Sequence, residues 1–542
     1  MTVLVFTSLS VAWMFAQTPA TSAHHEISGI VVSAKTGEPL ENTSVTVLQS
    51  SNRKTVAETL TNRAGRFQFS DVANGKYDLV ASRRGYVPSA YEQHDGGINT
   101  AIVTGDGLVS TGLLFQLAPQ GRIFGTVQED SGDPVPSAQV KLFQKDTNGG
   151  TGRMLAIKGD NADSMGNFEL GSLPPGKYVV CVIGTPWYAQ PKRSFPGMPS
   201  TAASGLARLD VVYAPTCYPG ATDPGEAESI AVAAGEQVSL NLTLHPVPGI
   251  HLSVPIPARD DNGQPAFSPP QVSTSIFGTS ESLPTQVNFT REDPHGPYTA
   301  DIELPAGQYT FSFPGQNGDP GRHMIVNADA SASALTTTSA DPDPTVNGTI
   351  QVEDGEPLPK SSVVWLESKD GNPSPATQVN PDGTFTMQSL QAGVYTVGVS
   401  SFPIARLIAK GAQVRGHLLT VGGEPVQLNI VVRRSSAILN GIVKRNGVPA
   451  SGVFVLLVPT GAQQTGDRAR PNQSDSDGTF NFRRIPPGDY TIVAIENGWK
   501  LDWANADTIK PYLARGQQIR VRPQTQEIDL PDSLQPMPQN PQ

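Results

Sequence analysis

The sequence predicts an all-β chain built from five β-sandwich domains in tandem. Three observations lead to this prediction: Gly and Pro are abundant, short phrases recur along the chain, and the recurrences are about 100 residues apart. The chain holds 53 Gly and 48 Pro among 542 residues, whereas an average protein has about 12% of the two together. Both residues interrupt helices and build turns, so we expect neither a large helical enzyme nor a coiled coil. A hydrophobic share of 37% can still build cores.

The N-terminal residues 1–23 are predicted to be a signal peptide. An apolar run from Met1 to Phe15 is too short for a membrane span, and the small residues at 21–23 fit a cleavage site. No Lys or Arg precedes the run, so a buried first strand is the alternative. No later stretch approaches 18 apolar residues, so we expect an exported mature chain without a membrane span, in the periplasm, at the cell surface or outside the cell.

The first recurring phrase is a turn that opens on Asn or Asp and closes on Gly, two residues before Phe. This pattern predicts a type I turn with a left-handed Gly, followed by a strand that starts at the aromatic residue. The last copy, Asp475–Gly478, has the acidic residues of a calcium loop, but it lacks a third alternating ligand and a distant Glu, so we expect a hairpin turn. The phrase occurs at Asn62–Phe67, Asp163–Phe168, Asn380–Phe385 and Asp475–Phe480.

The second phrase, Gly-x-Tyr, follows at a constant distance. From turn Gly to Tyr the spacing is 12 residues in four copies, and a fifth copy lacks a clean first phrase. A Gly-x-Pro turn and a strand that begins with Gly lie upstream of most copies. Each unit therefore has about seven short strands separated by turns, which is typical of a β-sandwich. The tyrosines are Tyr77, Tyr178, Tyr309, Tyr395 and Tyr490.

These phrases divide the chain into domains. Between the first two units and between the last two, linkers of almost no length favour a stiff rod. The predicted parts are a signal peptide at 1–23, sandwiches at 24–118, 119–247, 248–328 (divergent), 347–433 and 434–530, a linker at 329–346 and a disordered tail at 531–542.

The combination of phrases resembles the carboxypeptidase regulatory-like domain. That family is a transthyretin-like sandwich, related to Cna B-type repeats and grouped with carbohydrate-binding-like folds. The resemblance runs from about Ile27 to Leu530 and is weakest in the third copy. It implies five Ig-like, transthyretin-like sandwiches of an exported bacterial type, and it says far more about fold than about function.

The motifs of catalysis do not accompany this resemblance. A zinc carboxypeptidase needs a His-x-x-Glu pair and a distant His on one ion, and none of the eight histidines has Glu three residues later. No Gly-x-Ser-x-Gly elbow occurs either. We therefore predict an accessory module with no catalytic, cofactor-binding or metal-binding residues.

The two cysteines, Cys181 and Cys217, lie in the second unit. An exported protein favours their pairing, so we predict a disulfide.

Two aromatic stretches outside the recurring phrases are candidates for ligand binding. Sugar-binding sandwiches stack pyranose rings on exposed aromatic residues, and such residues occur at Trp187 and Tyr188 and again at Trp499 and Trp503. The alternative, which the residues favour, is that these rings pack closing segments onto the sandwiches. Trp365 lies inside a predicted strand and is expected in the core.

We therefore expect an exported, non-catalytic, multi-domain binding protein of the cell envelope. Carbohydrate, as polysaccharide or envelope glycan, is the favoured ligand class because of the fold resemblance. One alternative is a structural or adhesive stalk that presents a contact for a protein partner. A second is an enzyme whose site lies between domains. Nucleic acid is not expected as a partner, because the net charge is −11 and the longest Lys/Arg cluster is the Arg433–Arg434 pair.

Overall fold

The structure is a computed structural model of the chain. It describes residues 24–94, 97–146, 154–189, 211–255, 270–285, 287–290, 299–313, 322–329, 343–353, 355, 357–359, 361–368, 375–388, 390–400, 402–433, 437–460, 469–503, 505–522 and 527–539. The predicted signal peptide lies outside these residues, as does most of the predicted linker. Among the described residues, no helix has the length and apolar character needed to cross a bilayer.

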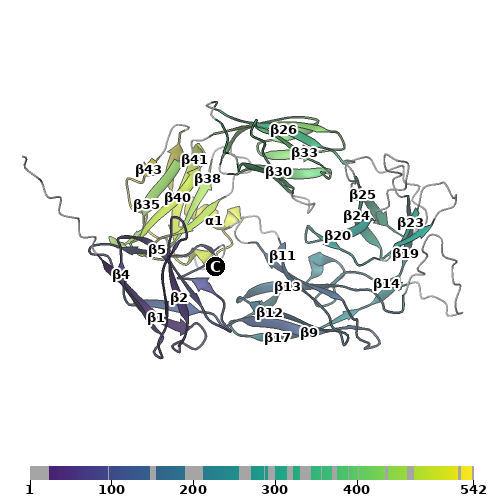
Figure 1. The fold of residues 1–542 in the computed structure, drawn as a ribbon, viewed down its shortest axis with the longest axis horizontal. Helices are drawn as coiled ribbons and strands as arrows, with labels where there is room; N and C mark the ends of the chain where they lie inside the picture. Colours follow the sequence, from purple (N-terminus) through teal and green to yellow (C-terminus); the bar gives the residue numbers. More distant parts are fainter. Residues whose placement is uncertain are drawn as a thin grey trace, which may run out of the picture.

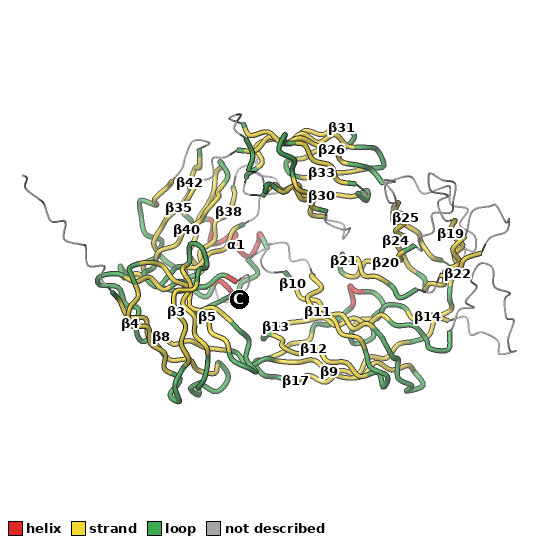
Figure 2. Tube along the Cα trace, in the orientation of Figure 1, coloured by secondary structure: helices red, strands yellow, loops and turns green. Residues whose placement is uncertain are grey.

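The chain is all-β and forms five sandwiches in tandem, as predicted (Figure 1). Strands and loops account for almost the whole trace in Figure 2. Each sandwich encloses its own cluster of buried apolar side chains. The hydrophobic share of the sequence is thus divided into five small cores, which is why each unit needs tight turns at both ends of its short strands.

The first domain shows the arrangement that the others repeat. Its opening strand is central in one sheet, antiparallel to the strand after the Asn-x-x-Gly turn and parallel to the closing strand. That sheet comprises β1 (His25–Ser33), β4 (Arg66–Val72) and β8 (Leu113–Leu117). The facing sheet comprises β2 (Ser44–Gln49), β3 (Thr55–Leu60), β5 (Gly75–Ser82), β6 (Ser89–Ala90) and β7 (Ile102–Thr104).

The second domain adds a third, two-stranded sheet to this plan. Its first sheet holds β9 (Gly121–Glu129), β12 (Asn167–Leu173) and β17 (Gln237–Leu244). The second holds β10 (Gln139–Lys145), β11 (Met154–Asn161), β13 (Gly176–Ile183), β15 (Thr216–Cys217) and β16 (Ile230–Val232). The additional pair is β14 (Val211–Tyr213) and β18 (Pro246–Pro248), and a short 3₁₀ turn, η2, spans Pro224–Glu226.

The third domain departs from the plan, in line with its weaker phrases. Its first strand still pairs with the strand before Gly-x-Tyr, but it lies at the edge of its sheet, whereas the opening strand of the first domain is central. One sheet holds β19 (Ile250–Pro255), β22 (Val287–Thr290) and β23 (Thr299–Leu304). The other holds β20 (Gln271–Ile276), β21 (Thr279–Ser282), β24 (Gly307–Phe313) and β25 (Arg322–Ala328).

The fourth domain returns to the plan and adds a fourth strand to its first sheet. One sheet holds β26 (Val346–Val352), β29 (Thr384–Met387), β31 (Ile404–Lys410) and β34 (Val426–Val432). The other holds β27 (Val363–Ser368), β28 (Ala376–Gln378), β30 (Gly393–Val399), β32 (Ala412–Arg415) and β33 (Leu418–Val421). Trp365 lies on the outward face of β27 with 39% of its surface exposed, so the prediction that it belongs to the core is wrong.

The fifth domain carries a short helix against its second sheet. The first sheet holds β35 (Ala437–Ile442), β40 (Thr479–Ile485) and β43 (Glu527–Asp529). The second holds β38 (Phe454–Pro459), β39 (Arg470–Gln473), β41 (Gly488–Ile495) and β42 (Gln517–Val521). The remaining elements are β36 (Lys444–Arg445), β37 (Val448–Pro449), the 3₁₀ turn η3 (Gly498–Lys500) and α1 (Ala506–Leu513).

The predicted disordered tail is ordered over residues 531–539. Leu534 is buried and bridges to Val443, and Met537 bridges to Ile495. The backbone N–H of Met537 donates to Ala494 O, 2.9 Å away. The prolines of this segment prevent regular strand pairing, but they leave enough N–H groups for it to lie along the edge of the domain.

The recurring residues have structural reasons that repeat from domain to domain. The Gly of the opening strand lies opposite the Phe of the turn phrase, as in the pairs Gly348–Phe385 and Gly441–Phe480. A Cβ on Gly441 would lie 2.3 Å from the ring of Phe480, so the glycine makes room for the aromatic ring.

The Gly-x-Tyr tyrosine also has one role in all five domains. Each hydroxyl donates a hydrogen bond to the carbonyl four residues earlier, at distances of 2.6–3.1 Å. The bond ties the Tyr strand to the turn that precedes it, which is a tyrosine corner. The five bonds join Tyr77 to Ala73, Tyr178 to Pro174, Tyr309 to Pro305, Tyr395 to Gln391 and Tyr490 to Pro486.

The five domains follow a curved path that brings the fifth beside the first (Figure 1). Hydrogen bonds and an ion pair join these two domains, including the contact of Lys76 with Asp475. The domains that the short linkers join therefore follow a curved path, and the stiffness of these linkers stays a prediction. The second and third domains are joined by an ion pair between Lys141 and Glu281, at 3.1 Å, and by a ring contact between Phe143 and Phe277.

Candidate binding site between the second and third domains

A pocket of about 60 Å³ lies where the second and third domains meet. The second domain contributes the chain that leaves β13, at residues 184–186, together with Ala189 and the strand β14. The third domain contributes residues 283–285 and 303–305. The lining is mainly aliphatic and proline, with a few polar groups, which is the usual make-up of a small-molecule pocket.

The aromatic pair Trp187–Tyr188 lies on a turn whose two ends line this pocket. The N–H of Ala189 donates to Pro186 O at 3.2 Å, and both of these residues belong to the lining. Trp187 is 63% exposed, and its ring meets that of Tyr188 edge to face with centroids 5.5 Å apart. The structure thus places one of the predicted aromatic stretches on a turn whose flanking residues, Pro186 and Ala189, line a pocket.

The second aromatic residue of this turn fixes it to the domain. The Tyr188 hydroxyl donates to the carboxylate of Glu129, which is buried. Burial and the Glu129 carboxylate raise the pKa of Tyr188. Burial, followed by the hydrogen bond with Tyr188, raises the pKa of Tyr213, which lines the pocket. Both phenols therefore remain protonated at neutral pH, so the Tyr188 hydroxyl can donate to the Glu129 carboxylate.

The polar side of the pocket comes from the third domain. Glu303 lies at the end of β23, its side chain is 15% exposed, and its Oε1 is 3.5 Å from Nδ1 of His251. A carboxylate and backbone carbonyls beside an aromatic face can accept hydrogen bonds from a ligand rich in hydroxyl groups. In the part of the chain that the structure describes, no group of three or more His, Cys, Asp or Glu side chains converges as metal ligands would.

The other aromatic stretch, at Trp499 and Trp503, lies in the fifth domain, away from this pocket. Trp499 stacks on His94 of the first domain with centroids 4.8 Å apart, and Phe454 meets it edge to face at 4.6 Å. Trp503 is 5% exposed and packs with α1 against the sheet. In this arrangement both rings take part in packing.

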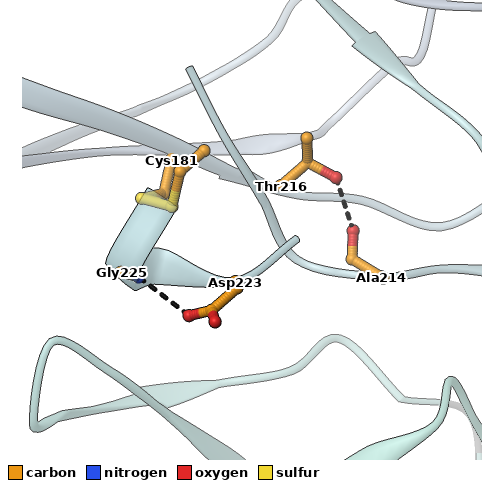
Figure 3. Close-up of a disulfide and its surroundings, with 6 residues drawn as sticks. Cys181, Ala214, Thr216, Asp223 and Gly225 are labelled. Carbon is orange, nitrogen blue, oxygen red and sulfur yellow. Dashed lines mark hydrogen bonds between the residues drawn. A yellow bond between two sulfur atoms is a disulfide. The ribbon is translucent and has the colours of Figure 1, made fainter. Parts of the chain in front are cut away.

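The predicted disulfide between Cys181 and Cys217 is confirmed (Figure 3). The two residues lie opposite each other on β13 and β15. Both are buried in an apolar cluster that includes Phe143 and, from the third domain, Ile276. The disulfide therefore holds the surface on which the third domain packs, beside the pocket.

Sequence reasoning did not find the pocket or the residues that support it. Glu129 and Glu303 belong to no recurring phrase: Glu129 supports the Trp187 turn within the second domain, and Glu303 lines the pocket where the third domain meets it. The one signal was the insertion rich in aromatic residues after the Tyr178 strand, which contains Trp187, Tyr188 and Tyr213.

Two segments match known families. Residues 26–104 match the family model of the carboxypeptidase regulatory-like domain. Residues 438–510 match that of the second β-sandwich domain of BOS complex subunit NOMO1-like proteins. The chain is thus a tandem β-sandwich protein, and these matches lie in its first and fifth domains. No curated protein matches the chain.

Solved structures that are similar to this chain include two pilins and one further bacterial protein. GBS52, the minor pilin of Streptococcus agalactiae, is 16% identical over 43% of this chain and all of its own, with a TM-score of 0.23. The TIE protein of Bacillus anthracis is 10% identical over 94% of this chain and 74% of its own, with a TM-score of 0.18. The shaft pilin SpaA of Lactobacillus rhamnosus GG is 8% identical over 42% of this chain and 98% of its own, with a TM-score of 0.20.

Proposed function

We propose that this chain is an exported, non-catalytic binding protein and that it binds carbohydrate at the pocket between its second and third domains. The observation that carries the proposal is the exposed ring of Trp187, which lies on a turn whose two ends line a pocket and which the hydrogen bond from Tyr188 to Glu129 fixes to the domain. A flat apolar ring suits the C–H face of a sugar, and Glu303 offers an acceptor for hydroxyl groups.

Export is supported by the disulfide. Such bonds form and persist in oxidising compartments and are rare in the cytosol. Cys181 and Cys217 are both buried and sit in a structural cluster, which indicates a permanent bond.

Affinity gel electrophoresis with soluble plant, fungal and bacterial polysaccharides tests the ligand class. We expect at least one polysaccharide to retard the protein and Trp187→Ala to weaken this binding at least about tenfold, the usual effect of removing a central aromatic contact. The matched control is Trp365→Ala, because Trp365 is a second exposed tryptophan on a different domain and should not affect retardation.

A second variant probes the polar side of the pocket. Glu303→Gln keeps the size of the side chain and removes its charge, so we expect weaker retardation, since a carboxylate is a stronger hydrogen-bond acceptor than an amide. The proposal fails if no polysaccharide retards the wild-type protein, or if Trp187→Ala is retarded as strongly as Trp365→Ala.

A structural or adhesive stalk is the second candidate, because rigidly joined sandwiches suit a spacer that presents a protein contact. In the arrangement described above, the fifth domain lies against the first. A stalk of full length therefore requires that contact to open, and small-angle scattering distinguishes an elongated particle from a closed one. An enzyme with a site between domains would instead turn over a ligand that the pocket binds.

A further inference from the structure

In two of its four copies, the turn that opens on Asn or Asp uses the side chain of that residue to stabilise itself, whereas in the fourth domain Asp382 accepts from the N–H and the hydroxyl of Thr384 instead. Asn62 Oδ1 accepts hydrogen bonds from the N–H groups of Ala64 and Arg66, at 2.9 and 3.0 Å. In the second domain, Asp163 Oδ1 accepts from the N–H groups of Met165 and Asn167 at 2.8 and 2.9 Å. In these copies the side chain at the first turn position is occupied within its own turn.

In the fifth domain another residue takes over this role. Asp477 Oδ1 accepts from the backbone N–H and the hydroxyl of Thr479, at 3.0 and 2.6 Å. The turn still closes through its backbone, because the Gly478 N–H donates to Asp475 O at 2.8 Å. The carboxylate of Asp475 is therefore available for a contact outside the turn.

That carboxylate reaches the first domain. Asp475 Oδ1 accepts from the Ala101 N–H at 3.0 Å, and the other oxygen contacts the ammonium group of Lys76. Only 7% of Asp475 is exposed. Burial raises its pKa, and the charge of Lys76 opposes this shift, so the carboxylate is desolvated and paired with a cation.

The next residue of the turn completes a strand-like contact. Ser476 N–H donates to Ala101 O at 3.0 Å, and Val103 N–H donates to the Ser476 hydroxyl oxygen at 2.8 Å. These bonds occupy one edge of strand β7, and the other edge of that strand pairs with β5. The turn of the fifth domain thus covers an edge of a sheet in the first domain.

Neighbouring side chains fit the same contact. Gln473 is 1% exposed and donates to Glu92 O at 3.0 Å and to the Thr100 hydroxyl oxygen at 2.6 Å. Gly452 lies so close to Glu92 that an added Cβ would be 2.8 Å from the carboxylate oxygen. The amide group of Gln473 is thus paired across the contact through its N–H groups, whereas its buried Oε1 has no hydrogen-bond partner among the described residues. A close fit with hydrogen bonds across it is typical of a specific interface.

We propose that the Asp475 turn, residues 475–478, is an intramolecular docking element that closes the five domains into a ring, and that Asp475 decides between the closed ring and an open chain. Opening removes the partners of Lys76 and of the β7 edge together, because all of them depend on this one turn. Two rigid states follow, a closed ring and an elongated array of sandwiches.

The test compares Asp475→Asn with a matched control at the same turn position, Asp163→Asn. Asn is the natural residue at this position in the first and fourth copies, so both variants should fold. In Asp475→Asn only one acceptor oxygen remains, so the amide N–H groups face either the Lys76 ammonium group or the Ala101 N–H, and in both orientations donor meets donor. In Asp163→Asn the side-chain oxygen still caps the turn.

We expect small-angle scattering to give a larger maximum dimension for Asp475→Asn than for the wild type. We also expect amide exchange at Ala101 and Val103 to accelerate at least tenfold. Asp163→Asn should match the wild type in both measurements. Lys76→Met should reproduce the opening, and the double variant should be no more open than either single variant, because both act through one contact.

The proposal is overturned if Asp475→Asn and Lys76→Met keep the wild-type dimension and exchange, or if the wild-type protein is already elongated. It is also overturned if Asp163→Asn opens the ring as much, because the turn would then act through domain stability. If Asp475→Asn unfolds the fifth domain, amide exchange in β38 and β41 will also be faster. In that case Lys76→Met, which changes only the first domain, decides whether the contact between Lys76 and Asp475 holds the ring closed.

Discussion

Loss of the Cys181–Cys217 disulfide should destabilise the second domain selectively. The two cysteines are 36 residues apart in the sequence. For a loop of this length, the loss of loop entropy in the unfolded chain amounts to about 4 kcal/mol. Each 1.36 kcal/mol is a factor of ten in an equilibrium constant, so about 4 kcal/mol corresponds to roughly 900-fold in the population of the unfolded domain.

Hydrogen exchange measures this change in the full chain, domain by domain. The protein is reduced in denaturant and refolded under reducing conditions, which keeps both sulfur atoms in place and adds no cavity. We expect the slowest amides of β10 and β13 to exchange several hundred times faster than in the oxidised protein. Peptides from β27 and β30 serve as the internal control, because the fourth domain contains no cysteine.

A change below about tenfold in β10 and β13 would refute the loop-entropy argument for this domain. An equal change in the fourth domain would show that reduction acts on the whole chain. Native oxidised protein should also resist dithiothreitol, because Cys181 and Cys217 are 0% and 2% exposed.

Three further predictions concern the recurring residues and one buried phenol. Gly125→Ala should cost about 3 kcal/mol or more, because the new Cβ would lie 1.6 Å from Leu240 O and force β9 from β17; unchanged exchange of β9 amides would contradict this. Tyr309→Phe should cost about 1–2 kcal/mol in the third domain by leaving its acceptor, the Pro305 carbonyl 2.9 Å away, without this donor, and wild-type exchange in β24 would argue against it. Burial, with a contribution from Glu92, raises the pKa of Tyr91 to about 12, so the stability that this phenol contributes is complete below pH 10 and is lost as the pH rises to about 12. Alkaline unfolding of the first domain should show a loss of about 2 kcal/mol that Tyr91→Phe abolishes, and an equal loss in that variant would assign the effect elsewhere.

The fold followed from the sequence because its determinants are local. The Asn-x-x-Gly turn is stabilised by a side chain that bonds to backbone two and four residues away, as at Asn62. The tyrosine corner spans four residues, as in Tyr490 and Pro486. Such contacts form wherever the residues occur in the right order, so their recurrence identifies the sandwiches.

Only part of the candidate site could be predicted from the sequence. The aromatic insertion drew attention to Trp187, but sequence alone could not tell an exposed ring from a packed one. Trp187 and Trp499 occur in similar polar and aromatic surroundings along the chain, yet one lies on a turn whose two ends line a pocket and the other is stacked on His94. Trp365 shows the same limit in reverse, because a tryptophan inside a strand can point to either face.

The sequence by itself determined the number of sandwiches, the positions of their turns and the chemistry of their corners. It also brought Cys181 and Cys217 together, because they belong to one repeat. The tertiary structure alone decided which aromatic rings are exposed, where two domains enclose a pocket, and that the first and last domains meet. These outcomes depend on residues as distant as Ala101 and Asp475, which are 374 positions apart. Contacts over such a separation are set by the accumulated orientation of five domains, and no local or periodic pattern of residues encodes that orientation.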